Sequence, residues 1–462
     1  MVTFPYVSRV LMPEGIGLVQ FYQSIINYIV LLSALGIPLY AVREIARLRD
    51  DETKRNKASF EILLLHALLS TIGYIIVFIL IISVTKIHSD WPLFLLLSLS
   101  IFFNVIGVSW FYQAVEDFKY ITIRSLIVRF LSAVALFIFV KDRSDLYAYA
   151  IILVFGQVGN YIFNFIRLRK FSFFKKIELS NLSLKPHLIA ALKIFILNVA
   201  ISLYVNINPV MLGFMSDDAY VGYYTSVTRI LTAANGLTLA LGGVILPRLS
   251  NYYAKGNYLE FKILKKKVLN IICILCIPLS FGLIIISPIL IPVFSGSAYS
   301  LAIPTLEISA LTVLFSALNY IISIQVLYTQ GQENIVIKST IIGGIVNILL
   351  NFILIPNLNQ NGTAISGLCA ELSVLICCYV LGNKYIQYNL FNKNNLQALI
   401  STIGACLICS ILYKLQLKDY ILLPLIIISV AVLYLSFLMI LKNKLVLEYK
   451  NELRQRIKLL NS

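Results

Sequence analysis

Charged residues are scarce in this chain of 462 residues: Asp, Glu, Lys and Arg make up only 13% of it, against about 25% in soluble domains. Hydrophobic residues make up 59%, and the mean hydropathy is +0.88. A fold surrounded by water could not bury that much apolar surface. The composition therefore excludes a water-soluble globular protein.

Histidine is rare, and cysteine occurs only within apolar stretches. The histidines, His66, His88 and His187, are far apart in the sequence, and the two Cys pairs with C-x-x-C spacing have Ile and Leu as neighbours. A metal or redox centre needs several ligands in polar surroundings. We therefore expect no metal site, no cofactor and no disulfide framework.

Enzyme motifs are also lacking. The sequence has no G-x-x-x-x-G-K-[ST] loop, which argues against direct ATP hydrolysis, and no Ser/His/Asp arrangement or carboxylate pair stands out. The loops predicted to face outward are at most about a dozen residues long, which leaves little room for catalytic groups. An enzyme is therefore the weaker class, with a polysaccharide polymerase or ligase as its main representative.

Apolar runs of about 20 residues recur along the chain, and each is long enough to cross a hydrocarbon layer of about 30 Å as a helix. The runs do not alternate apolar and polar residues as membrane barrel strands do. We predict an all-α integral membrane protein with thirteen transmembrane helices, near residues 18–40, 59–85, 91–112, 119–140, 145–166, 188–214, 221–245, 268–294, 303–328, 336–356, 364–383, 396–414 and 420–441.

The basic residues predict the orientation. Of the 38 Lys and Arg residues, 28 fall in one set of alternating loops and tails, and only 6 fall in the opposite set. Because basic loops remain in the cytoplasm, we expect a multi-pass membrane protein with its C-terminus inside. This distribution explains most of the net charge of +17 without a nucleic-acid partner.

The chain contains a weak internal repeat. Residues 17–43 align without a gap with residues 222–248, at an offset of 205, so that Gly17 matches Gly222 and Arg43 matches Arg248. Six spans separate the copies, an even number, which predicts parallel repeats related by an axis along the membrane normal. The span at 188–214 precedes the second copy and has no counterpart before the first, so we infer a missing first helix and 14 helices in the complete architecture.

Four basic residues lie within the predicted spans. Arg129 and Arg229 are near mid-span, where a charge costs about 2.5–3.5 kcal/mol and requires a partner or an aqueous cavity. Arg124 and Lys193 are closer to the predicted cytoplasmic face, which their side chains could reach. Arg129 and Arg229 are therefore the first candidates for binding a ligand.

Acids and amides within the spans allow two interpretations each. Glu371 and Glu307 could pair with an arginine or carry a coupling proton. Amides such as Asn104 and Asn164 could bond between helices, or they could line a cavity for a hydroxyl-rich ligand such as a sugar. The sequence leaves both questions open.

Two regions resemble a known family. The opening Phe4-Pro-Tyr-Val-Ser-Arg-Val-Leu-Met-Pro-Glu-Gly-Ile-Gly, followed by Leu35-Gly-Ile-Pro-Leu-Tyr-Ala-Val-Arg-Glu-Ile-Ala, resembles the start of Wzx-type O-antigen and polysaccharide flippases. These belong to the multidrug/oligosaccharidyl-lipid/polysaccharide exporter superfamily. Val221-Gly-Tyr-Tyr-Thr-Ser-Val-Thr-Arg and Val244-Ile-Leu-Pro-Arg-Leu-Ser resemble the second-lobe segment of the family. Family members begin with a helix of which this chain has only the tail.

The resemblance implies two six-helix lobes around a central cationic cavity, with alternating access. We predict an N-terminal lobe at 1–180, a C-terminal lobe at 181–390, and two additional helices with a basic tail at 391–462. The implied cargo is an undecaprenyl-diphosphate-linked oligosaccharide for O-antigen, capsule or exopolysaccharide synthesis, and the implied location is the bacterial cytoplasmic (inner) membrane. The implied partners are that glycan, membrane lipid, and a polysaccharide polymerase with its chain-length machinery.

Arginine can bind the oxygens of a diphosphate with two parallel hydrogen bonds. The candidate substrate-binding residues are Arg129, Arg229, Lys193, Arg124, Arg43 and Arg248, with Glu371 and Glu307 as candidates for ion coupling. The closest alternatives are a lipid II flippase and a cation-coupled drug exporter of the same superfamily. An exporter of cationic drugs should have acidic rather than basic residues in its cavity.

Overall fold

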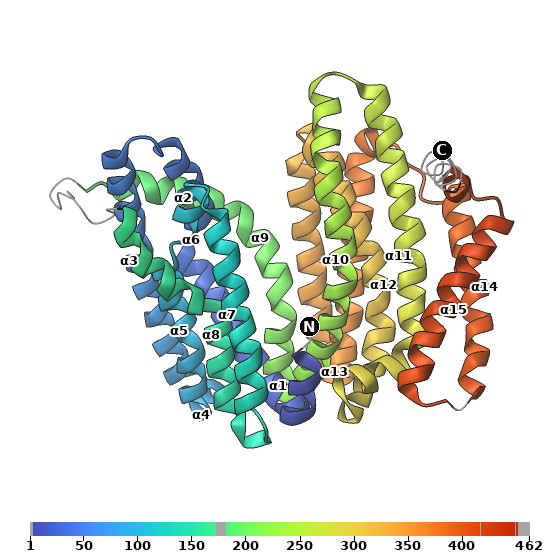
Figure 1. Cartoon of the computed structure of the whole chain (residues 1–462), viewed down its shortest axis with the longest axis horizontal. Helices are drawn as coiled ribbons and strands as arrows, with labels where there is room; N and C mark the ends of the chain where they lie inside the picture. Colours follow the sequence, from blue (N-terminus) through green and yellow to red (C-terminus); the bar gives the residue numbers. More distant parts are fainter. Residues whose placement is uncertain (1–2, 172–181, 416, 449, 451–462) are drawn as a thin grey trace, which may run out of the picture. The chain divides into compact units, whose positions relative to one another are not determined.

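The computed structural model describes residues 3–171, 182–415, 417–448 and 450 (Figure 1), and within these ranges the secondary structure is helical with no β-strand. The predicted all-α class is confirmed. The chain forms two compact units, Val2–Gly222 and Tyr223–Ser462. This division falls beyond residue 180, and the predicted lobes at 1–180, 181–390 and 391–462 stay a prediction.

The first unit contains nine α-helices in the described ranges, and a tenth begins there and continues into the second unit. These are α1 (Phe4–Ala34), α2 (Ile37–Arg47), α3 (Glu52–Ser83), α4 (Thr85–Ser89), α5 (Trp91–Gly107), α6 (Ser109–Ala114), α7 (Phe118–Phe139), α8 (Leu146–Arg167), α9 (Lys185–Met215) and α10 (Asp218–Ala254). The long helix α1 is kinked at Met12, where φ is 58°, and Pro13 is the next residue. Proline lacks the N–H that a continuous helix requires, which explains the position of the kink.

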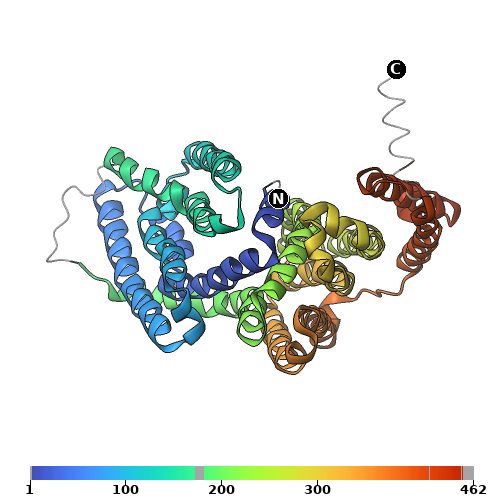
Figure 2. The same ribbon diagram turned by 90° about the horizontal axis from the view of Figure 1, so that it is seen from below.

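The second unit continues from α10 with α11 (Tyr258–Ser295), α12 (Ile303–Tyr320), a π-helical turn (Ile321–Leu327), α13 (Glu333–Ile386), α14 (Lys393–Ser410) and α15 (Asp419–Ile440). α13 reverses direction at Asn359, where φ is 48°. Gly343 consequently lies against Val374, and Gly362 against Leu354, so α13 forms two antiparallel legs. Figure 2 shows α14 and α15 at one edge of this unit.

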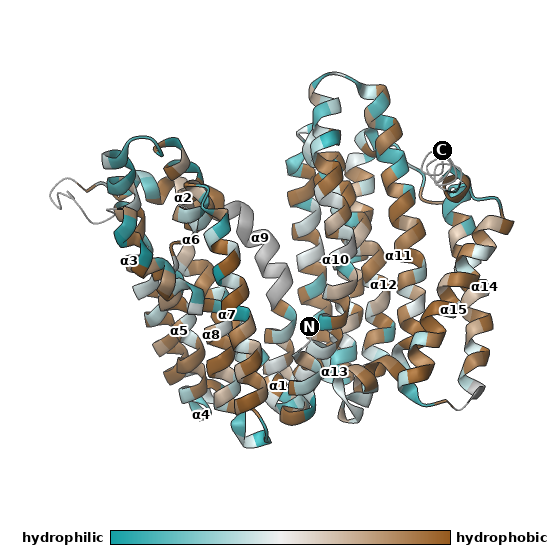
Figure 3. Cartoon of the chain, viewed as in Figure 1, coloured by the Kyte–Doolittle hydropathy of each residue, from teal (hydrophilic) through white to brown (hydrophobic). Residues whose placement is uncertain are grey.

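Eleven helical segments of the described chain are long and apolar enough to cross a membrane. Large apolar side chains face outward on them: Phe130 on α7 is 69% exposed, Val380 on α13 is 72% exposed, and Ile440 on α15 is 71% exposed. In Figure 3, hydrophobic residues predominate along the middle of the helices of each unit. Such exposure is stable next to lipid tails and confirms a multi-pass membrane protein, while the count of thirteen spans stays a prediction.

The repeat-related glycines contact each other where α1 crosses the start of α10. A Cβ atom added to Gly17 would collide with the main-chain carbonyl of Asp218, and one added to Gly222 would collide with that of Pro13. Pro13 and Asp218 are also 205 residues apart, so the two collisions are reciprocal. Reciprocal contacts of this kind are typical of segments related by a local two-fold axis, and they support the parallel repeat.

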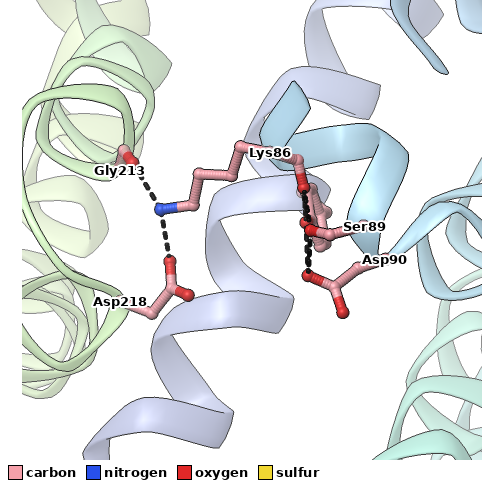
Figure 4. Close-up of polar contacts among 6 residues, drawn as sticks. Lys86, Ser89, Asp90, Gly213 and Asp218 are labelled. Carbon is pink, nitrogen blue, oxygen red and sulfur yellow. Dashed lines mark hydrogen bonds and ion pairs between the residues drawn. The ribbon is translucent and has the colours of Figure 1, made fainter. Parts of the chain in front are cut away.

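A cluster of polar contacts holds the amino end of α10 in place (Figure 4). Lys86 Nζ donates a hydrogen bond of 2.6 Å to the Gly213 carbonyl and lies 2.8 Å from an oxygen of Asp218. Tyr22 donates to the Lys86 carbonyl at 2.8 Å and to Asp90 at 3.0 Å. The cation therefore lies at the carboxyl end of α9 and the anion at the amino end of α10, which is the arrangement that helix dipoles favour.

Gly222→Val should destabilise the protein because the added side chain meets main-chain atoms that cannot move aside. We expect a loss of about 3 kcal/mol or more, at the upper end of overpacking, with a lower melting temperature of the detergent-purified chain. The control is Gly236→Ala on the same helix, because a Cβ there has nothing within 4 Å. Equal melting temperatures of Gly222→Val and the unmodified chain would show that α1 and α10 do not pack this closely.

Candidate functional site

In the first unit, α5 and α6 are consecutive helical segments separated by a break in the backbone. α5 ends at Gly107 and α6 begins at Ser109, and between them Val108 has a φ of 35°. A β-branched residue in the left-handed region costs about 1–3 kcal/mol and persists only where the surrounding contacts enforce it. In membrane transporters, breaks of this kind are typical of binding sites.

Asn164 of α8 stabilises the break. Its Nδ2 atom donates hydrogen bonds to the Gly107 carbonyl and, at 3.3 Å, to the Ser109 hydroxyl. Its own main-chain carbonyl accepts a hydrogen bond of 2.6 Å from the Tyr112 hydroxyl. Asn164 is fully buried, so the amide replaces the water that a broken helix would otherwise need. Of the two interpretations that the sequence left open for Asn164, bonding between helices is the one observed.

A cavity of about 330 Å³ lies beside the break, within the size range of sites for small ligands. Its lining combines amide, hydroxyl, imidazole and aromatic groups with apolar residues of α2, and consists of Pro38, Leu39, Val42, His66, Asn104, Gly107, Ser109, Trp110, Gln113 and Tyr161. Asn104, an amide within a predicted span, therefore does line a cavity.

Two buried polar groups of this lining have no hydrogen-bond partner among the described residues. They are Nδ1 of His66, a residue 2% exposed, and Nε1 of Trp110, a residue 4% exposed. An indole nitrogen can only donate, whereas an imidazole nitrogen donates or accepts according to its tautomer. With the amides of Asn104 and Gln113 and the aromatic faces, the cavity is suited to a neutral ligand rich in hydroxyl or amide groups.

Two of the predicted cations lie on α7 and face different directions. Arg124 is 8% exposed, whereas Arg129 is exposed. Five residues correspond to a rotation of about 140° around a helix, which explains the difference. Neither arginine forms an ion pair with a described acid, as a charge within a membrane span ordinarily would.

The other predicted basic residues are spread over both units. Arg43 on α2 is exposed, as are Arg229 and Arg248 on α10 in the second unit. The side chain of Lys193 lies outside the described residues. The assignment of the predicted cations to a common site stays a prediction.

Both predicted acids have polar partners in the second unit. Asn319 Nδ2 donates a hydrogen bond of 2.6 Å to Glu371 Oε2, and Ser287 donates one of 3.0 Å to Glu307 Oε1. Both of these partners are neutral, and pairing of either acid with an arginine stays a prediction. A role in ion coupling stays a prediction for both.

Sequence reasoning missed a buried polar network in the first unit. His187 Nε2 lies 2.9 Å from Glu61 Oε2, and His187 Nδ1 lies 2.6 Å from the Tyr40 hydroxyl. The Ser183 N–H donates a hydrogen bond of 2.8 Å to Glu61 Oε1. The network joins α2, α3 and α9, which are distant in sequence. The signal available was a histidine and a glutamate near helix ends on the same predicted side of the membrane.

The fold and its apolar helices define a polytopic membrane protein. The structure is similar to that of the lipid II flippase MurJ in an inward closed conformation, with a TM-score of 0.75, 16% identity, and coverage of 96% of this chain and 97% of that chain. It is also similar to an inward-facing multidrug resistance MATE family transporter, with a TM-score of 0.66, 16% identity, and coverage of 83% and 93%.

Residues 1–253 match the family model described as polysaccharide biosynthesis protein, and the chain belongs to this family. A relative from Escherichia coli (strain K12), named "Putative O-antigen transporter", is 28% identical over 393 residues, which cover 84% of this chain and 93% of the relative. The predicted resemblance to polysaccharide flippases is confirmed.

Asn164→Leu should destabilise the protein because it leaves the Gly107 carbonyl without its donor in a buried position. The expected cost is about 1–3 kcal/mol, seen as a lower melting temperature in detergent. Ser109→Ala is the matched control, because it removes only the contact of 3.3 Å. If both variants have the same melting temperature, Asn164 does not stabilise the break.

Proposed function

We propose that this protein is a flippase that translocates undecaprenyl-diphosphate-linked oligosaccharide repeat units across the cytoplasmic membrane by alternating access, for O-antigen, capsule or exopolysaccharide synthesis. Family membership and the relative's name support a cargo connected with polysaccharide. The basic loops support a cytoplasmic C-terminus. The protein performs transport rather than a chemical reaction.

The observation that carries this proposal is the polar cavity beside the broken helix. Sugars present many hydroxyl groups and flat apolar ring faces. His66 and Trp110 offer buried nitrogens without a described partner, and Trp110 and Tyr161 offer aromatic rings. A ligand that pairs with such groups is bound in preference to a competitor without the matching hydroxyl, because the competitor leaves the groups unpaired. We propose that part of the glycan enters this cavity during transport.

The cations provide the second line of support. A diphosphate carries negative charge through the membrane and needs basic residues along its path. Arg129 and Arg229 remain the first candidates, followed by Arg43, Arg248, Arg124 and Lys193. Glu371 and Glu307 are proposed as the groups that couple transport to an ion gradient. A cation-coupled drug exporter is less well supported, because Arg124 and Arg129 have no acidic partner among the described contacts.

Trp110→Phe should reduce transport by about fivefold, because it keeps an aromatic ring but removes one hydrogen-bond donor worth about 1 kcal/mol. The measurement is surface polysaccharide in a bacterium whose own flippase for the matched glycan is deleted and which expresses this chain. Trp91→Phe is the matched control, since Trp91 begins α5 and is 49% exposed. Equal polysaccharide in the two variants would remove Trp110 from the glycan site.

Arg129→Gln should reduce polymer at the surface by tenfold or more while expression is unchanged, because a charge-assisted hydrogen bond is worth about 1.5–3 kcal/mol. Lipid-linked repeat units should accumulate in the inner leaflet of the same cells. Arg143→Gln is the control, since Arg143 is exposed in the 3-10 turn Arg143–Asp145, between α7 and α8.

The same strains separate the alternatives. Rescue of lipid II transport in place of the glycan would favour the lipid II flippase. Well-expressed protein that restores no polymer but lowers the uptake of cationic drugs would favour the drug exporter. Polymer that depends on the chain, with unpolymerised repeat units in the outer leaflet in its absence, would favour the polymerase.

A further inference from the structure

A second cavity in the first unit, of about 360 Å³, lies between the start of α7 and the end of α8. Three basic side chains line it, Lys119, Arg124 and Arg167, and Asp117 is the acid in its lining. Arg167 Nη2 is 2.7 Å from Asp117 Oδ2, which holds the end of α8 against the residue that precedes α7. Three cations against one anion give the cavity a local charge of +2.

Arg124 lines this cavity with two of its three guanidinium nitrogens buried and unsatisfied within the described chain. Its Nε and Nη1 atoms are buried and have no hydrogen-bond partner among the described residues. The guanidinium carbon lies 5.2 Å from the centroid of the Tyr120 ring, and the Arg167 guanidinium carbon lies 3.7 Å from the same centroid. The ring holds both cations in place, but it cannot accept the in-plane N–H groups of Arg124, which suit the oxygens of an anion.

Apolar side chains continue the cavity towards the membrane. Ile123 and Ile127 line the cavity and are 48% and 54% exposed. They are four residues apart on α7, about one helical turn, and Phe130 follows with 69% exposure. A cationic pocket that opens onto an apolar strip on one helix matches a ligand with an anionic head and a hydrocarbon chain.

We propose that this cavity binds the phosphate-bearing headgroup of a membrane lipid, with Arg124, Arg167 and Lys119 around the phosphate and the lipid chain along Ile123 and Ile127. The basic residues at this end predict that the lipid comes from the cytoplasmic leaflet. The lipid is either an anionic phospholipid or a prenyl diphosphate carrier. The carrier rests on the proposed function, whereas the phospholipid does not.

The test is native mass spectrometry of the full chain purified in detergent, titrated with dioleoyl phosphatidylglycerol, dioleoyl phosphatidylcholine, undecaprenyl diphosphate or inorganic pyrophosphate. The unmodified chain should bind the two anionic lipids at least tenfold more tightly than phosphatidylcholine. Arg124→Gln should abolish that preference. Lys57→Gln, an exposed basic residue of α3 predicted at the same face, is the matched control and should keep the preference.

Two further variants keep the test decisive if Arg124→Gln does not fold. Lys119→Gln removes an exposed cation of the cavity and should weaken binding of the anionic lipids about threefold. Ile127→Ser should weaken binding of the lipids but leave pyrophosphate unaffected. Equal losses in Lys119→Gln and Lys57→Gln would overturn the site, because they would indicate general attraction to basic protein. Equal binding of phosphatidylcholine and the anionic lipids would overturn it as well.

The ligands distinguish the two sources. Tighter binding of undecaprenyl diphosphate than of phosphatidylglycerol, lost in Arg124→Gln, would assign the site to the carrier and support the proposed function. Tighter binding of phosphatidylglycerol would assign it to a structural or regulatory phospholipid and leave the proposed function to its own tests. Pyrophosphate binding as tight as that of the lipids would overturn the role of the apolar strip.

Discussion

The structure depends on one constraint, which is that a polar group surrounded by hydrocarbon must find its partner within the protein. Continuous helices meet it along most of their length, and where α5 breaks, the amide of Asn164 supplies the missing donor. Against this background the unsatisfied groups are informative. His66 and Trp110 beside the break, and Arg124 on α7, keep buried nitrogens without described partners. Each unpaired nitrogen costs free energy of folding, and a membrane protein tolerates that cost where a ligand or water supplies the missing hydrogen bond.

Close packing at the start of α10 is the second condition for the fold. Gly17 and Gly222 allow two backbones to approach to a distance that no side chain would permit, and the approach is reciprocal through Pro13 and Asp218. Small residues are the usual means by which membrane helices associate, because water does not drive them together.

Much of the fold could be predicted from sequence, but less of the site. Hydropathy gave the all-helical membrane class, and the offset of 205 residues paired Gly17 with Gly222 before any contact was known. The partners of charged residues could not be predicted in the same way. The rotation of α7 about its axis decides which of Arg124 and Arg129 faces α8. The contact between Arg167 and Asp117 depends in turn on which helices are neighbours. The network of His187 with Glu61 was missed for this reason, since it spans 126 residues of sequence.

The two cavities of the first unit are chemically different. Tyr161 lines the polar cavity, and Arg124 lines the cationic one. A lipid-linked glycan has three chemically distinct parts, a sugar, a phosphate-containing link and a hydrocarbon chain, and their order is fixed. The polar cavity, Arg124 and the Ile123–Ile127 strip offer the matching environments within one compact unit. A ligand with only one of these parts would leave the other environments unsatisfied, so discrimination would arise from their combination rather than from any single residue.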